Sequence, residues 1–379
     1  MKRTLLFSVL IGLIFSVSAQ KQDGYYPGRT IDFPDIPGYV TLIADLHTHT
    51  ALSDGYVWPN IRIEEAVRDS LDAISITDHI EYQPHSHDIP HPDRNRSFEI
   101  ASEAAKNQPL IVINGAEITR NMPPGRCNAI FLEDVNKLNI SDSVKAFKEA
   151  KKQGAFVFWN HPNWEAQAID GVAKMKDFHK KLIKKEMLHG IEVVNDVTYS
   201  DEALQIALDY DLTIMGTSDI HGLVDWQYDV PTGGHRPVTL VFAKEKSEAS
   251  LKEALFNKRT IVFFNNMLIG REEYLVPLIY ASLEVKGAKY INTWAGKTNV
   301  AIVQIENKSD SPLILKNTSN FNFHDHGEIV VLKPHFVTEL RVKPLENLKE
   351  FELNFEVIST VTAPKTHPEI TIKVIIDKE

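Results

Sequence analysis

Short apolar runs alternate with amphipathic segments between about residues 40 and 265, and this alternation constrains the fold more than any other feature. The segments 61–71 and 201–208 repeat their apolar residues at helical spacing. Strands that alternate with helices indicate a parallel sheet built from βαβ units. Seven such units could close into a barrel or form an open, doubly wound sheet, and periodicity alone does not distinguish the two. The predicted strands are 40–46, 73–77, 110–118, 155–159, 191–195, 213–217 and 238–243, with a further short strand or hairpin arm at 128–132.

The pattern changes after about residue 274. Apolar and polar residues alternate strictly at 351–357, which is typical of a half-buried strand, and no helical pattern separates the strand-like runs of this region. We therefore predict an antiparallel β-sandwich of about 100 residues. The sequence does not indicate a role for it. The predicted division of the chain is 1–19 for a signal peptide, 20–273 for an α/β domain and 274–379 for the sandwich.

The N-terminus has the composition of an export signal. Lys2 and Arg3 precede an apolar run at 5–17, and small residues at 16–19 form a cleavage-site pattern. The run is shorter than a membrane-spanning helix requires, although an uncleaved anchor is the alternative. No later segment is apolar for long enough to span a membrane, so we expect a secreted or periplasmic protein. Cys127 is the single cysteine, which excludes an intramolecular disulfide.

The charge of the chain limits its partners. The formal net charge is −10, and no cluster of basic residues stands out. Binding to duplex nucleic acid depends on many basic contacts to phosphates, so this composition argues against it. Small anionic substrates remain compatible with the sequence, because a bound metal ion can reverse the local sign of the charge. The sequence gives no indication of the oligomeric state.

Metal-ligating side chains recur where the predicted strands end. His47 and His49 close the first strand, and both can reach one ion because residues two apart on a strand face the same side. In α/β sheets the carboxyl ends of the strands face the side on which active sites form. Imidazole and carboxylate ligands without a thiolate suit zinc, manganese or iron. The other strand-end groups are Asp78-His79, Glu117, His161, Asp219 and His221.

Together these motifs resemble the PHP (polymerase and histidinol phosphatase) family over roughly residues 40–265. The resemblance implies a distorted (β/α)7 barrel, which would settle the choice between a closed and an open sheet. It also implies a phosphoesterase with two or three divalent ions in the barrel mouth. The motifs that carry it are the run His47-Thr48-His49-Thr50-Ala51-Leu52-Ser53-Asp54-Gly55, then Thr77-Asp78-His79, Gly115-Ala116-Glu117, Asn160-His161-Pro162 and Ser218-Asp219-Ile220-His221.

The resemblance assigns eight metal ligands by position. His47, His49 and Asp219 would hold one ion, and Glu117 would bridge it to a second ion bound by His161. Asp54, His79 and His221 would hold a third ion. Family members usually have another histidine after the bridging glutamate, where this chain has Arg126 followed by Cys127.

Arginine has no lone pair free to bind a metal. We therefore predict two well-occupied ions and a weak or empty position between Glu117 and His161. The alternative is that Cys127, His161 and water hold a third ion there.

Basic side chains could bind the phosphate group of a substrate. Divalent ions would neutralise the phosphoryl oxygens and lower the pKa of bound water to ~7, which supplies a hydroxide nucleophile. The predicted function is therefore metal-dependent hydrolysis of a small phosphate mono- or diester. The alternatives are an amide or lactone hydrolase of the amidohydrolase type, and a non-catalytic protein that binds metal or phosphate. The candidate phosphate-binding residues are Arg94, Arg96, Arg126 and Arg236.

Overall fold

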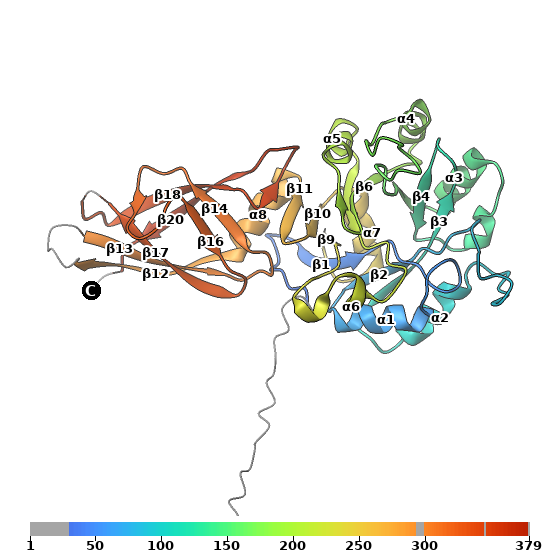
Figure 1. Cartoon of the computed structure of the whole chain (residues 1–379), viewed down its shortest axis with the longest axis horizontal. Helices are drawn as coiled ribbons and strands as arrows, with labels where there is room; N and C mark the ends of the chain where they lie inside the picture. The colour runs from blue at the N-terminus through green and yellow to red at the C-terminus, as the bar shows by residue number, and fades with distance from the viewer. Residues whose placement is uncertain (1–29, 293–298, 345, 378–379) are drawn as a thin grey trace, which may run out of the picture.

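The computed structural model describes residues 30–292, 299–344 and 346–377. The predicted signal peptide at 1–19 lies outside these residues. An α/β part with the ligand motifs lies at one end of an elongated molecule, and an all-β part lies at the other (Figure 1). In the described ranges, no helix combines the length and the apolar composition that crossing a membrane requires.

All seven predicted strands of the α/β part are present. The sheet runs in the order β9, β1, β2, β3, β4, β5, β6, with β8 paired to the far side of β6. The short run at 128–132 is the hairpin arm β4 (Arg126–Ile130), which pairs antiparallel with both neighbours. The strands are β1 (Val40–Asp45), β2 (Ala73–Ile76), β3 (Ile111–Thr119), β5 (Phe156–Trp159), β6 (Gly190–Asn195), β8 (Thr213–Thr217) and β9 (Val238–Ala243).

The prediction of an entirely parallel sheet is wrong for β9. This strand runs antiparallel to β1, because the segment between β8 and β9 contains only the short helices α6 (Val224–Gln227) and η2 (Val230–Thr232). No long helix carries the chain back to the opposite end of the sheet there. Strand β9 therefore starts at the end of the sheet where β8 stops. The start of β9 consequently lies beside the carboxyl end of β1, with Thr239 opposite Ala44.

Threonine side chains close the curled sheet between β8 and the neighbouring strands. The Thr239 hydroxyl accepts from the Gly216 N–H at 3.0 Å and donates to the Gly216 carbonyl at 2.8 Å. The Thr260 hydroxyl on β10 (Thr260–Phe264) donates to the Ile214 carbonyl at 2.8 Å. A Cβ at Gly216 would lie 2.2 Å from Val262, so glycine allows this close approach. The structure therefore confirms the predicted distorted barrel.

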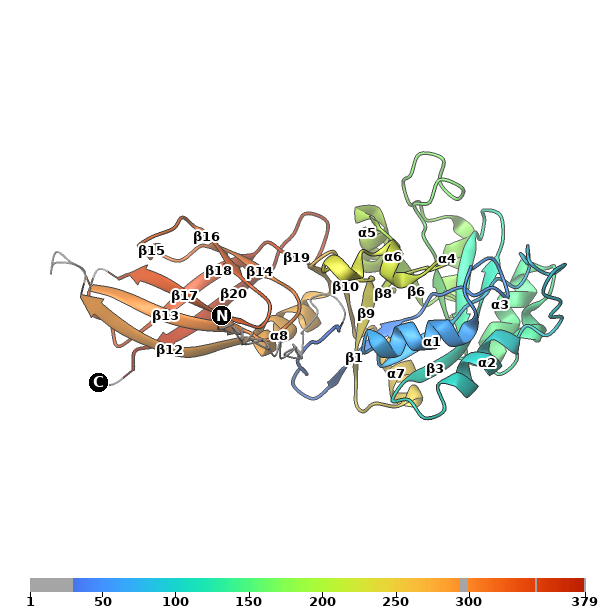
Figure 2. The same ribbon diagram turned by 60° about the horizontal axis from the view of Figure 1, so that its bottom comes forward.

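Helices cover the outside of the barrel sheet (Figure 2). The predicted helices at 61–71 and 201–208 are confirmed. Side chains cap several of them: the Ser200 hydroxyl accepts from the N–H of Ala203, and the Asp142 carboxylate accepts from the N–H of Lys145. The helices are α1 (Pro59–Arg68), α2 (Arg96–Ala104), η1 (Val135–Leu138), α3 (Ser143–Lys152), α4 (Asp177–Lys184), α5 (Asp201–Asp209) and α7 (Glu248–Phe256).

The predicted β-sandwich is confirmed as two antiparallel sheets whose alternate residues are buried. Helix α8 (Glu272–Ser282) was not predicted, and the predicted boundary at residue 274 falls inside it. Pro277 and a nearly continuous apolar composition hide its helical period. The sheets comprise β12 (Leu283–Asn292), β13 (Asn299–Asn307), β17 (Phe336–Lys343) and β15 (Asn322–Phe323), and β16 (Ile329–Leu332), β14 (Leu313–Asn317), β18 (Glu350–Val357) and β20 (Glu369–Ile375).

The two parts share one hydrophobic core. Phe33 and Phe263 of the barrel side, Leu275 of α8, and Ile305 and Leu313 of the sandwich belong to one continuous buried cluster. The sandwich also returns a strand to the barrel, because β19 (Thr360–Val361) pairs in parallel with β11 (Met267–Gly270). The sandwich is therefore packed against the barrel through apolar side chains and a backbone ladder.

A buried ion cluster joins α1, β1 and β9. Arg236, directly before β9, donates to Asp69 at 2.6 and 2.9 Å and to Asp45 at 3.2 Å. Burial lowers the pKa of Arg236, but the two carboxylates outweigh that effect and raise it above its ordinary value. A buried charge whose partner is removed loses its compensation and destabilises the fold.

We expect Arg236→Ala to lower the free energy of unfolding by about 3–5 kcal/mol, because Asp45 and Asp69 would stay buried without their cation. Urea denaturation of the purified protein measures the change. The matched control is Arg68→Ala, because the Arg68 side chain is 60% exposed and pairs with Asp225 at 3.5 Å. The control should change the free energy by no more than about 1 kcal/mol. Equal effects of the two substitutions would contradict the assignment.

Candidate metal centre

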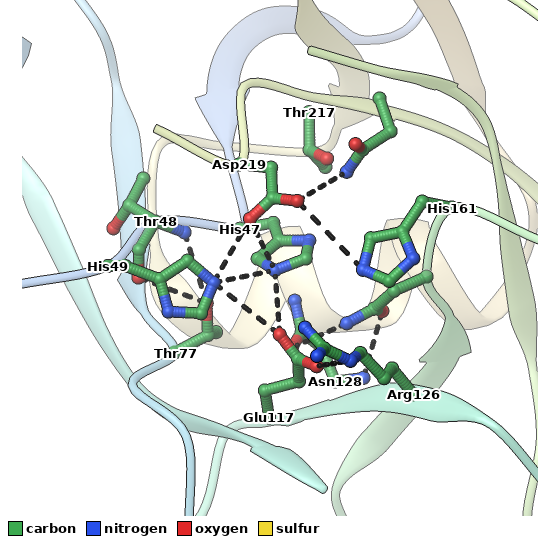
Figure 3. Close-up of polar contacts among 12 residues, drawn as sticks. His47, Thr48, His49, Thr77, Glu117, Arg126, Asn128, His161, Thr217 and Asp219 are labelled. Atoms are coloured by element: carbon green, nitrogen blue, oxygen red, sulfur yellow. Dashed lines mark hydrogen bonds and ion pairs between the residues drawn. The ribbon is translucent and has the colours of Figure 1, made fainter. Parts of the chain in front are cut away.

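The carboxyl ends of β1 and β8 bring three predicted ligands together. The Nε2 atoms of His47 and His49 lie 3.0 Å apart, and Oδ1 of Asp219 lies 3.1 and 3.0 Å from them (Figure 3). Both histidine side chains are completely buried. We call His47, His49 and Asp219 the first ligand group.

A second ligand group lies on the other side of His49. Nε2 of His79 lies 3.1 Å from Oδ2 of Asp54, and Nε2 of His221 lies 3.3 Å from its Oδ1. Nδ1 of His49 lies 3.6 Å from the same Oδ1. We call His49, Asp54, His79 and His221 the second ligand group. His49 therefore presents one ring nitrogen to each group.

Glu117 occupies the centre of the cluster. Its Oε2 lies 3.3 Å from Nε2 of His47, 3.4 Å from Nε2 of His49 and 3.4 Å from Nδ1 of His79. His161 stands at the edge, with its Nε2 3.9 Å from Oδ2 of Asp219 (Figure 3). The structure thus brings all eight predicted ligands into one cluster.

The donor set fits divalent cations. Two imidazole nitrogens of the first ligand group point at each other and at a carboxylate oxygen, a geometry that a cation satisfies better than protons do. Oδ1 of Asp219 is buried and makes no hydrogen bond to any residue that the structure describes, although two ring nitrogens lie close to it. Each ligand group places its candidate ligand atoms within 4.8 Å of one another.

The titration of the cluster shows its need for positive charge. Burial lowers the pKa of His79, but Glu117 and Asp54 outweigh burial and raise it to about 10. The pKa values of His47 and His221 are raised in the same way, because the neighbouring carboxylates outweigh the lowering effect of burial. Burial raises the pKa of Asp219, yet the neighbouring histidines bring it well below its ordinary range. Without ions, the carboxylates therefore favour protons on His47, His79 and His221, and bound cations would displace those protons. Burial instead lowers the pKa of His161.

Arg126 enters the cluster from β4. Its Nε lies 3.7 Å from Oε1 of Glu117 (Figure 3). Its guanidinium lies 4.5 Å from the ring centroid of Trp164. The next residue, Cys127, is buried in the apolar cluster that contains Trp159, and burial raises the pKa of its thiol. Neither ligand group contains Cys127 or His161 among the residues that the structure describes.

The other predicted phosphate-binding arginines have protein partners. Arg94 donates to the carbonyls of Ile80 and His91, so it fixes the loop after β2. Arg96 is exposed at the start of α2 and pairs with Glu99 at 3.0 Å. The buried guanidinium of Arg236 would have to leave Asp45 and Asp69 to reach a substrate. Of the four, only the position of Arg126 supports the prediction.

Two residues that were not predicted as metal ligands hold the ligand loops. Arg62 of α1 is completely buried, and it donates to the carbonyls of His49, Ile220 and His221 at 2.8, 3.2 and 2.8 Å. The carboxylate of Asp78 accepts from the N–H and the hydroxyl of Thr50 and from the hydroxyl of Ser53.

Glu192 on β6 orients His47 and His161. Its Oε1 accepts from Nδ1 of His47 at 2.7 Å and from the Thr217 hydroxyl at 2.6 Å. Its Oε2 accepts from the backbone N–H of His161 at 2.7 Å, where φ is +28°. The first contact leaves Nε2 of His47 free for a metal, and the second helps to hold a left-handed backbone conformation. The available sequence signal was a single carboxylate inside the apolar run at 191–195.

Comparisons with known proteins agree with this organisation. A family model described as an Ig-like domain matches residues 283–373. A solved two-domain protein from Bacteroides vulgatus, which contains a predicted PHP-like metal-dependent phosphoesterase, is 42% identical with a TM-score of 0.84. The match covers 93% of this chain and 100% of that chain. No curated protein matches the chain.

More distant solved structures match part of the chain. PsfC from Pseudomonas syringae is 16% identical with a TM-score of 0.41, over 64% of this chain and 96% of its own. An amidohydrolase from Chromobacterium violaceum is 14% identical with a TM-score of 0.34, over 47% of this chain and 87% of its own. These two likenesses carry no conclusion about chemistry.

We expect Glu192→Gln to weaken metal binding by about 10- to 100-fold, because an amide cannot accept hydrogen bonds on both of its ends. Competition with a chromophoric chelator measures the dissociation constant. Glu103→Gln is the matched control, because the Glu103 side chain is 76% exposed on α2. An unchanged dissociation constant in a correctly folded Glu192→Gln protein would show that Glu192 does not position the ligands.

Proposed function

Because this chain belongs to the family of two-domain proteins with a PHP-like metal-dependent phosphoesterase domain, we propose that it hydrolyses small phosphate mono- or diesters. The proposal includes two divalent ions, of zinc, manganese or iron, in the barrel mouth. The observation that carries it is the cluster in which two ligand groups share His49 and Glu117 contacts both groups. The residues at 1–19 further support a proposal that the protein is exported.

Different residues of the cluster would bind the ions and position the ligands in such a reaction. Divalent ions there would neutralise the phosphoryl oxygens and lower the pKa of a water molecule toward ~7. The first ligand group would hold one ion and the second ligand group the other, with Glu117 between them. Glu192 and Arg62 fix the ligands before a substrate arrives, so little reorganisation would be needed during the reaction.

Arg126 supports an anionic substrate over a neutral amide or lactone. Its guanidinium is cationic, and its planar fork of donors matches a phosphate group. The guanidinium lies within the cluster and lines the cavity beside it. A neutral substrate would offer no charge to balance this cation, whereas a phosphate ester would pair with it directly.

The metal-loaded protein should hydrolyse phosphomonoesters or phosphodiesters, and a chelator should abolish the turnover. We expect His79→Ala to lower kcat/KM by about a hundredfold or more, since it removes a ligand of the second ligand group. His87→Ala is the control, because the His87 side chain is 97% exposed. A panel of phosphate esters, amides and lactones measures the rates. Turnover of amides alone would favour the amidohydrolase alternative, and binding without any turnover would favour a non-catalytic protein.

The charge of Arg126 raises the free energy of a cation placed near it. We therefore expect two strong anomalous peaks in crystals soaked with manganese or zinc, one at each ligand group. Arg126→His should add a third peak between Glu117 and His161. Three full peaks in the unchanged protein would contradict the two-ion proposal.

A further inference from the structure

A cavity of about 670 Å³ opens beside the ligand cluster. Asp54, His161, Asp219, His221 and Arg126 form its lining on the cluster side. The rest of the lining comes mainly from the loops that follow β5 and β6 and from α6, and we call it the outer wall. The residues of the outer wall used below are Asn163, Trp164, Glu165, Asp196, Thr198 and Gln227.

We propose that the outer wall binds the sugar ring of a sugar phosphate, an inference that rests on the proposed function. The alcohol part of the substrate would then be a hexose-type carbohydrate whose phosphate meets Arg126 and the ligand cluster. Two features of the outer wall carry this inference, an aromatic ring next to the cluster and a set of oriented hydrogen-bond acceptors.

Trp164 supplies the aromatic surface. Its side chain is 42% exposed, although the ring is held in place. His161 contacts it with ring centroids 5.2 Å apart at 78°, and Arg126 lies over one of its two faces, so a sugar would pack on the other. The C–H groups of a sugar ring carry partial positive charge and pack on the electron-rich face of an aromatic ring. Because Trp164 lies directly beside His161, the group bonded to the phosphate would meet it first.

Asp196 supplies the best-oriented acceptor. Its Oδ1 accepts from Nε2 of Gln227 at 2.6 Å, which directs the carboxylate. The Tyr228 hydroxyl lies 3.1 Å from the same oxygen, and it also donates to the Ser218 carbonyl at 2.7 Å. An ionised carboxylate can only accept hydrogen bonds, and it binds hydroxyl donors strongly. Glu165 adds a second carboxylate to the outer wall, and Asn163 and Thr198 add uncharged polar groups.

The composition of the outer wall favours some alcohol parts of a phosphate ester over others. Two carboxylates repel a second phosphate, which disfavours nucleic acid chains and bisphosphates. A simple alkyl group would leave the acceptors without donors, which costs binding free energy when water is displaced. A nucleobase could stack on Trp164, but in a nucleotide the base lies one sugar further from the phosphate. A polyhydroxylated ring attached to the phosphate satisfies both the aromatic face and the acceptors.

The test compares glucose 6-phosphate, ethyl phosphate and adenosine 5′-monophosphate as substrates of the metal-loaded full chain. The three leaving groups are all primary alcohols, so differences in kcat/KM report mainly binding. We expect kcat/KM for glucose 6-phosphate to exceed that for ethyl phosphate at least about tenfold, and Trp164→Ala or Asp196→Ala to reduce this ratio about tenfold. Trp226→Ala, whose side chain is 79% exposed, is the control and should keep the ratio.

A binding measurement complements the rates. Saturation-transfer NMR with glucose 6-sulfate, whose sulfate stands in for phosphate, should label the sugar-ring protons with the unchanged protein and lose that transfer with Trp164→Ala. Equal kcat/KM for sugar and ethyl phosphates, or a ratio unaffected by Trp164→Ala, would overturn the sugar inference and leave the phosphoesterase proposal standing. A preference for adenosine monophosphate that depends on Trp164 would also overturn it. Hydrolysis of no phosphate ester would instead overturn the proposed function, and the NMR result would still decide whether the outer wall binds sugar.

Discussion

The buried guanidinium of Arg62 connects helix α1 to the loops that carry the candidate metal ligands. It reaches from α1 to the carbonyls of His49, Ile220 and His221, so one side chain fixes the loops that follow β1 and β8. These loops supply every member of both ligand groups except His79, which follows β2. Glu65, one turn further along α1, pairs with Arg62 at 2.6 Å and also accepts from the N–H of Val224. A charge with this many fixed partners is compensated although it is buried, and it orients the ligand loops independently of any ion.

The ligand cluster, which the loops held by Arg62 largely form, concentrates negative charge. Asp54, Glu117 and Asp219 place three carboxylates among the imidazoles, and their combined field raises the pKa of His47, His79 and His221 when no cation is there. Arg126 brings a permanent cation to the remaining side of Glu117. Each ligand group could therefore hold a cation, and Arg126 already supplies positive charge beside them. If cations bind at the ligand groups, an anion that enters the cavity would meet both them and the guanidinium, which is the electrostatic basis of the proposed preference for a phosphate ester.

Sequence reasoning succeeded where one local rule determines the outcome. Parallel strands end at the same edge, so residues that follow several strands, such as His47 and His79, had to come together. It failed where the outcome depends on distant partners. The direction of β9 depends on the absence of a crossing helix before it, and the role of Arg236 depends on Asp45 and Asp69, which are far away in the sequence. Glu192 reads as an isolated charge in a strand until the fold places His47 and His161 against it.

The sandwich belongs to the same cooperative structure. Without β19, strand β11 would present an open edge to solvent, and unpaired edges invite association with other chains. The shared core extends from Phe263 of the barrel through α8 to Leu313 of the sandwich, so separation of the two parts would expose apolar surface on both. Figures 1 and 2 show α8 between the two parts in both views. Because the interface is apolar and continuous, hinge motion between the parts is disfavoured, and any ligand bound by the sandwich would keep a fixed orientation relative to the barrel mouth.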